Sequence, residues 1–303
     1  MYYDGVSEQM GGVTCLDIKY LLVLQEIRES APEWINNLMQ LITDTAGGIL
    51  ILLIPMIVFF CVDKKKGEFI WISLVIASVI NVFVKCLFCV YRPWIRSELI
   101  NPSAKAIEGA GDYSFPSSHT QGSASAFGSL AYVYRKKKLL SIICICVILL
   151  VAFSRNYLGV HTPQDVAVAF MYSIMMWFVS YKLLSWIDNT KNGDIILLIV
   201  YAAVAVLWTC FIGSVGNAGA GIAYMLSLVL DRRLVNYGIP DNIMFRGLVA
   251  AIGGVGFLLL IDNASGILST ICGNYTGMVT SFCYMFYIMA IVPSLVMLIR
   301  HKG

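Results

Sequence analysis

The sequence SRNYLGVHTPQD, residues 154–165, joins two long apolar runs and brings a guanidinium, an imidazole and a carboxylate to one membrane edge. Ionisable side chains beside hydrocarbon are costly to keep there and usually serve a function. The chain has three histidines. His161 lies in this stretch and His119 lies at the start of another apolar run, so the stretch predicts both a pair of helices around a polar turn and the place where function concentrates.

Composition identifies a membrane protein. The chain has 303 residues, of which 59% are hydrophobic and 13% are charged, with a mean hydropathy of +0.79; soluble domains carry about 25% charged residues. We therefore expect an all-α polytopic protein. The net charge of +3 is small, and the basic residues cluster between apolar runs, which argues against nucleic-acid binding and indicates topology signals instead.

The cysteines give no sign of a metal site or cofactor. Most of the nine fall inside apolar runs, where they are expected to act as small buried hydrophobes. Cys86 and Cys89 form a CxxC pattern, but within a helix and without histidines at zinc spacing. A disulfide between Cys15 and Cys272 stays an open alternative without support.

We expect about nine transmembrane helices, because a spanning helix needs about 20 apolar residues. Residues 16–45 are expected to form an amphipathic helix at the membrane interface, interrupted near Pro32. This divides the chain into an extracytoplasmic segment (1–45), a catalytic core (46–189) and additional helices (190–303). The nine apolar segments are 46–62, 67–90, 118–134, 139–154, 163–184, 194–212, 215–230, 244–262 and 277–299.

The basic residues predict the orientation. With nine segments, every basic cluster between the segments falls on one side, which the positive-inside rule assigns to the cytoplasm. The N-terminus is then outside, with no cleavable signal peptide visible, and the C-terminus is inside. Loops 91–117 and 155–162 both lie outside, so the two histidines emerge on the extracytoplasmic face. The clusters are 64–66, 135–138, 182 and 191, 232–233, and 300 and 302.

Two clusters of polar residues precede the opening stretch. Lys85 and Arg92 are seven residues apart, about two helical turns, and would share one helix face as an anion clamp, unless Lys85 only snorkels and Arg92 only anchors at headgroups. Ser117 is a suitable N-cap, which would point the backbone N–H groups of Ser118 and His119 at an anion. The alternative there is an ordinary serine cap with a histidine beside it.

In the opening stretch, Pro163 suits the first position of a helix capped by Thr162. Asp165 either completes a capping box or accepts the N–H of His161 and leaves the other ring nitrogen free to attack. Arg155 adds a planar cation that can bind phosphate through two N–H groups. Three cations, a helix N-terminus and two histidines suit phosphoryl transfer, and without an acidic cluster for Mg²⁺ the simplest route is metal-free.

The ordered motifs Lys-x6-Arg-Pro (85–93), Pro-Ser-x-His (116–119) and Ser-Arg-x5-His-x3-Asp (154–165) resemble the type 2 phosphatidic acid phosphatase superfamily. The motifs cover about residues 85–165, and helices 46–184 fit that family's helical core. The nine-segment layout is similar to glucose-6-phosphatase and sphingosine-phosphate phosphatase. One departure is Ser118, where the family often has glycine.

The resemblance implies a role for each matching residue. His161 would be the nucleophile that forms a phosphohistidine, Asp165 would orient it, and His119 would protonate the leaving oxygen and later activate water. Lys85, Arg92, Ser117, Ser118 and Arg155 would hold the phosphoryl oxygens, with no metal or cofactor. Asp112 and Glu108 match no motif and are expected at the solvated edge of a lid.

Several functions remain in competition. The leading one is hydrolysis of a lipid phosphate or isoprenoid diphosphate at the outer leaflet, with the bilayer and the lipid as partners. The same site would serve a lipid phosphotransferase or a phosphatase of a soluble sugar phosphate. A transporter or scaffold is disfavoured because 194–299 carries almost no charge inside its segments, and a soluble haloperoxidase does not fit this hydropathy. The Gly-rich stretch 213–221 is compatible with self-association, but nothing indicates an oligomer.

Overall fold

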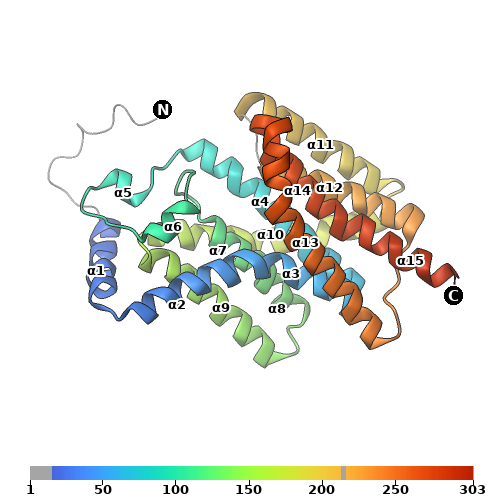
Figure 1. Ribbon diagram of the computed structural model, residues 1–303, viewed down its shortest axis with the longest axis horizontal. Coiled ribbons are helices and arrows are strands. Elements are labelled where there is room, and N and C mark those ends of the chain that lie inside the picture. The colour runs from blue at the N-terminus through green and yellow to red at the C-terminus, as the bar shows by residue number, and fades with distance from the viewer. Residues whose placement is uncertain (1–15, 213–215, 303) are drawn as a thin grey trace.

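The computed structural model describes residues 16–212 and 216–302, and throughout these ranges the regular structure is helical, without a strand (Figure 1). This confirms the expected all-α class. The Cys15–Cys272 disulfide, left open by the sequence, involves a residue outside the described ranges, and the cysteines within those ranges form no disulfide with one another.

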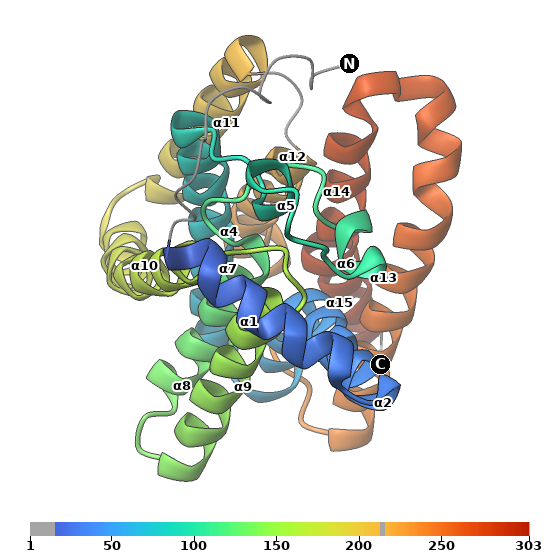
Figure 2. The ribbon, with the colours of Figure 1, turned by 90° about the vertical axis from the view of Figure 1, so that its left-hand side faces the viewer.

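The N-terminal part differs from expectation in where its first spanning helix begins. Helix α1 (Leu16–Ser30) ends before Pro32, as predicted, and lies across the end of the bundle (Figure 2). Residues 33–45, expected at the interface, instead run directly into the first apolar segment, so that one span covers Glu33–Val62. This span consists of α2 (Glu33–Asp44), η1 (Thr45–Ile49), α3 (Leu50–Ile57) and η2 (Val58–Val62).

The central part of the chain is built on three long helices, α4, α9 and α10, and on a shorter helical run through residues 118–133. This shorter run has wider, π-type turns at its centre. The helices are α4 (Lys64–Phe88), α5 (Pro93–Arg96), α6 (Ala104–Glu108), α7 (Ser118–Ser123), η3 (Ala124–Gly128), α8 (Ser129–Val133), α9 (Lys138–Tyr157) and α10 (Pro163–Asn189).

The C-terminal helices pack beside α4 and α10, with α14 lying against α12 and α13 (Figures 1 and 2). They are α11 (Gly193–Ile212), α12 (Gly216–Leu230), η4 (Asp231–Val235), α13 (Ile243–Cys272), η5 (Gly273–Tyr275), α14 (Thr276–Phe286), η6 (Tyr287–Ile291) and α15 (Val292–Lys302).

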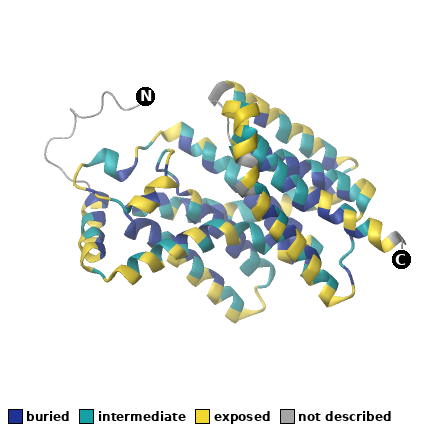
Figure 3. Ribbon diagram, viewed as in Figure 1, coloured by how far each residue is buried: buried dark blue, intermediate teal, exposed yellow. Residues whose placement is uncertain are grey.

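The expected count of nine spans is not confirmed. Each of the nine predicted segments is helical, but seven helices within the described ranges are long and apolar enough to cross a membrane. The helix at 118–133 is short, and α12 continues directly into the charged turn of Asp231, Arg232 and Arg233. Exposed residues recur along the long helices (Figure 3), and many of them are large and apolar, as expected for surfaces that face lipid.

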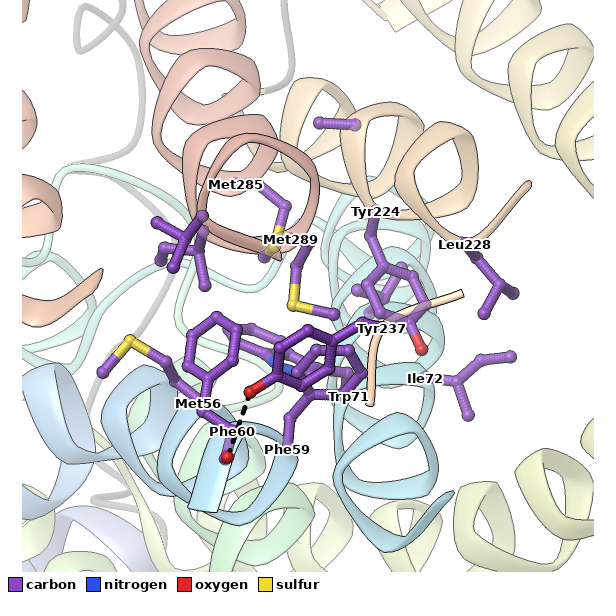
Figure 4. Close-up of a cluster of buried hydrophobic side chains, with 14 of the residues drawn as sticks. Met56, Phe59, Phe60, Trp71, Ile72, Tyr224, Leu228, Tyr237, Met285 and Met289 are labelled. Atoms are coloured by element: carbon purple, nitrogen blue, oxygen red, sulfur yellow. Dashed lines mark hydrogen bonds between the residues drawn. The ribbon is translucent and has the colours of Figure 1, made fainter. Parts of the chain in front are cut away.

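A buried aromatic and methionine cluster joins the C-terminal helices to the central part (Figure 4). The ring of Tyr237 stacks on Phe59 with centroids 5.5 Å apart and meets Phe60 edge-on at 5.7 Å. Its hydroxyl donates to the Phe60 carbonyl at 3.1 Å, and the hydroxyl of Tyr224 donates to the Glu68 carbonyl at 3.0 Å. Buried aromatic hydroxyls need such acceptors, so these contacts fix α12 and the 235–240 loop to the first two spans.

The basic turns gather at one end of the bundle. Arg232 pairs with Asp188 at 2.7 Å, Lys65 lies 3.9 Å from the same carboxylate, and the Lys66 ammonium lies 4.6 Å from the centre of the Tyr134 ring. Because α4 rises about 1.5 Å per residue over its 25 residues, its other end, with Lys85, lies on the opposite side of the bundle. The polar loops after α4 and α9 are found there.

Candidate active site

All eight residues predicted for the phosphate site lie at the end of the bundle remote from the basic turns. They come from the end of α4 and the turn after it, the start of α7, the end of α9, and the start of α10 with the turn before it. Six of them are buried, including Lys85, Arg92, Arg155 and His161, although charged side chains are seldom buried without a reason. Ser118 is exposed and His119 is half-buried.

Lys85 and Arg92 converge, but not by sharing a helix face. Helix α4 ends at Phe88, where Cys89 takes a left-handed backbone conformation (φ 47°). Arg92 therefore lies beyond the helix, and Pro93 begins the short α5 instead of ending α4. The expected shared face is wrong, and the two cations meet because the chain turns back after the helix.

The carboxylate of Asp112 lies between these two cations. Its Oδ2 is 3.2 Å from Lys85 Nζ, and its Oδ1 accepts from Arg92 Nη2 at 2.6 Å. The Asp112 carbonyl also accepts from Arg92 Nε at 2.8 Å, and the carbonyl of Tyr113 accepts from Lys85 Nζ. Asp112 was expected only at the solvated edge of a lid. Its side chain is 57% exposed, yet it forms ion pairs with both of the cations proposed to hold phosphate.

The imidazole of His161 is held between a cation and a carboxylate. Its Nε2 lies 2.9 Å from Arg92 Nη1, and its Nδ1 lies 3.4 Å from Asp165 Oδ2, too poorly aligned to count as a hydrogen bond. Since a guanidinium can only donate, Nε2 accepts and the ring proton is assigned to Nδ1, facing Asp165. Burial, followed by the charges of Arg92, Arg155 and Lys85, lowers the pKa of His161 well below its usual value, so the ring is neutral.

Asp165 forms the predicted capping box and lies beside His161 without an aligned hydrogen bond to it. Its Oδ2 accepts from the Thr162 backbone N–H at 2.8 Å, and Thr162 Oγ1 accepts from the Asp165 N–H at 3.4 Å, which makes the predicted capping box. The same Oδ2 accepts from Ser114 Oγ at 2.6 Å. A capped and hydrogen-bonded carboxylate is fixed in position beside His161 Nδ1.

Arg155 has unused hydrogen-bonding capacity. Its side chain is 2% exposed, and Nη1 donates to Thr43 Oγ1 at 3.1 Å, while Nε and Nη2 have no partner. Buried polar groups are nearly always paired, and an unpaired pair of guanidinium N–H groups matches the geometry of a phosphate. Burial lowers the pKa of His119, and the positive charge of nearby Arg155 lowers it further.

The turn before α7 is fixed from two sides. Ser117 caps the helix as predicted, with its Oγ accepting from the Thr120 N–H at 3.4 Å, and its own N–H donates to the Asp165 carbonyl at 3.1 Å. Ser118 Oγ donates to Asn81 Oδ1 at 2.9 Å. His119 packs on Gly47, where an added Cβ would lie 3.1 Å from its Cδ2.

Asp112, Asn81, Thr43 and Ser114 match none of the three motifs, and each contacts a site residue that is 20 or more positions away along the chain. Among the described residues, no group of three or more His, Cys, Asp or Glu side chains could hold a metal ion.

A family profile and two curated relatives match parts of this chain. The PAP2 superfamily profile matches residues 69–189, a range that contains all eight predicted site residues. Phosphatidylglycerophosphatase B of Bacillus subtilis is 29% identical over 154 residues, 48% of this chain and 73% of the relative. Undecaprenyl-diphosphatase of Sulfolobus acidocaldarius is 29% identical over 128 residues, 42% of this chain and 60% of that relative.

No solved structure matches the chain significantly. The order of the three motifs, the convergence of their side chains and both curated relatives agree with the profile match. Residues 69–189 therefore form a PAP2 superfamily domain within a multi-pass membrane protein, and both curated relatives of this chain are named phosphatases.

Proposed function

We propose that this phosphatase hydrolyses a lipid phosphate or isoprenoid diphosphate at the extracytoplasmic membrane face, through a phosphohistidine on His161. The observation that supports this most is the placement of a neutral, buried His161 between Arg92 and Asp165, beside an arginine with two unused donors. The curated relatives are named for a lipid phosphate and a lipid diphosphate.

In the first step, His161 Nε2 attacks phosphorus while the bond to the leaving oxygen breaks, and His119 supplies a proton to that oxygen. Arg92 shifts its Nη1 donor from His161 to a phosphoryl oxygen, which frees the nucleophilic lone pair. Arg155 contributes its two unused donors, and Lys85 contributes its charge. Donors that are already oriented stabilise the charge that develops in the transition state without reorganising.

In the second step, His119, now neutral, takes a proton from water, and the hydroxide attacks the phosphohistidine. The N–P bond breaks, inorganic phosphate leaves, and His161 returns to its neutral state. Asp165 holds the Nδ1 proton in place throughout and stabilises the positive charge of the ring while it carries the phosphoryl group. His161 must start neutral, as its lowered pKa requires. His119 must carry a proton before the first step, and because its pKa is lowered in the free enzyme, the negative charge of the bound phosphate has to raise that pKa so that His119 takes up a proton.

The extracytoplasmic placement is supported by the basic turns at the other end of the bundle. Single cysteines placed at the exposed residues Lys105 and Lys136, in a chain without its natural cysteines, test it. A membrane-impermeant maleimide applied to intact cells should label position 105 and leave position 136 unlabelled; the reverse pattern would contradict the orientation.

The activity is tested with purified protein in detergent and a panel of phosphatidylglycerophosphate, isoprenoid diphosphate, phosphatidate and glucose 6-phosphate. We expect phosphate release from the lipids, loss of release in His161→Ala, and an acid-labile phosphoprotein in the wild type alone. Undiminished release by His161→Ala ends the phosphohistidine mechanism. Transfer of labelled phosphate to a second lipid instead of water would identify a phosphotransferase, and a preference for glucose 6-phosphate would identify a sugar phosphatase.

A further inference from the structure

A cavity of about 220 Å³ begins at the proposed acid–base residue and runs away from the phosphate site. Ser118 and His119 line it at one end, on α7. One side wall comes from η1, α3 and α4, where Ile51 and Val75 contribute apolar surface. The opposite wall comes from α12 and α14, which lie outside the residues that the family profile matches.

The lining changes in character along the cavity. Its polar residues belong to α4 and α7, with Ser78 and Gln121 near the two α7 residues that face the site. The wall from the C-terminal helices is made of Ala220, Gly221, Tyr284 and Met285, which present small or apolar surface. A molecule with a charged head at His119 and a hydrocarbon body would match this arrangement, because burial of apolar area stabilises each methylene that enters.

The wall formed by α12 and α14 is rigid. An added Cβ at Gly219 would lie 1.8 Å from the Met278 carbonyl oxygen, so the two backbones are in direct contact. Ser281 Oγ accepts from the Ala220 N–H at 3.1 Å and donates to the Gly216 carbonyl. Small residues that allow such close approach are typical of stable helix pairs in membranes, and a wall of fixed position can select by size.

The volume suits a short run of hydrocarbon. An apolar cavity of about 150 Å³ accommodates benzene, so a cavity of about 220 Å³ takes on the order of eight carbons. The remainder of a longer chain would continue outward into the bilayer. The cavity would therefore select for the part of the substrate that adjoins the phosphate.

We propose that the cavity holds the first part of the hydrocarbon chain of the substrate, and that Ala220 and Met285 of the C-terminal helices set the chain length it accepts. This rests on the proposed lipid phosphatase activity and assigns to α12 and α14 a part in substrate selection. Neither residue is among the eight predicted for the phosphate site, so changes there should alter selection by chain length more than the chemistry at phosphorus.

The test uses the full chain in detergent with a homologous series of n-alkyl phosphates, from butyl to hexadecyl. In the wild type we expect kcat/KM to rise about fourfold for each methylene that enters the cavity and then to level off. Ala220→Phe fills part of the cavity and should move this plateau to shorter chains. Met285→Ala enlarges it and should move the plateau to longer chains.

Ala203→Phe is the matched control, because Ala203 is exposed on α11 and does not line the cavity; its profile should equal that of the wild type. If Ala220→Phe does not give a monodisperse protein, the profile of Met285→Ala decides. An unchanged length profile in a folded cavity variant that still hydrolyses butyl phosphate overturns this inference and leaves the phosphatase proposal standing. A wild type that hydrolyses none of the series overturns the phosphatase proposal itself.

Discussion

Removing the charge of Asp112 should tighten the binding of phosphate. In the free enzyme this carboxylate contacts Lys85 Nζ at 3.2 Å and Arg92 Nη2 at 2.6 Å, so an incoming phosphate has to displace it. Contacts between charged groups contribute about 1.5–3 kcal/mol each when buried. Asp112 is 57% exposed, and solvent screening reduces its net contribution to about 1 kcal/mol.

Asp112→Asn is isosteric and keeps the loop contacts made by the main chain. At about 1.4 kcal/mol per factor of ten, a loss of about 1 kcal/mol of competition corresponds to roughly fivefold tighter binding. We expect the inhibition constants of inorganic phosphate and of orthovanadate to fall by that factor, measured by competition against a lipid phosphate. Product release should slow as well, because the carboxylate no longer helps to expel phosphate.

Glu108→Gln is the matched control, since Glu108 is exposed at the end of α6 in the same loop and loses the same charge; its inhibition constants should stay within twofold of the wild type. Weaker phosphate binding by Asp112→Asn would refute the reasoning. It would mean that Asp112 holds Lys85 and Arg92 in a binding position and does not compete with the ligand.

Four further results are expected. Arg155→Met should lower kcat/KM by about 100-fold without lowering the thermal unfolding temperature, because it removes a buried cation with two unpaired donors. Since the pKa of His161 lies below its usual value, its imidazole stays neutral as the pH falls through about 6.5, and rapid-quench phosphoenzyme formation should persist at mildly acidic pH; loss of the burst there would contradict this. Gly47→Ala pushes on the His119 ring and should lower kcat about tenfold, with KM unchanged in steady-state assays. Ser117→Ala should cost about 1 kcal/mol of stability in chemical unfolding.

Local chemistry was enough to predict much of the fold. The cap at Thr162 with proline after it, the serine cap at 117 and the break near Pro32 are each set by neighbouring residues, and each occurs as expected. The start of the first span was harder to predict, because Gly47 and Gly48 are accommodated in a wide helical turn instead of ending the helix. The number of spans depends on how far helices 118–133 and 216–230 extend, which hydropathy alone does not determine.

The candidate site also has features that the sequence predicts and features that depend on packing. Motif spacing identified the residues that converge, including His161 and Arg155, because their order along the chain carries the pattern. It did not predict that Lys85 and Arg92 meet through a turn of the chain, or that Asp112 neutralises them. The contact between Asp112 and Arg92 joins residues 20 positions apart, and Lys85 and Arg92 meet because the chain turns back after α4.

The contact between Glu68 and the C-terminal helices limits how this protein can be divided. The carboxylate of Glu68 is 6% exposed and pairs with Arg232 at 3.3 Å, while its carbonyl accepts from Tyr224. A chain truncated after residue 189 would lose both of these contacts, together with the C-terminal members of the buried cluster that pack on Phe59 and Phe60. The family domain is thus not a detachable module, and studies of its enzymology need the whole polypeptide.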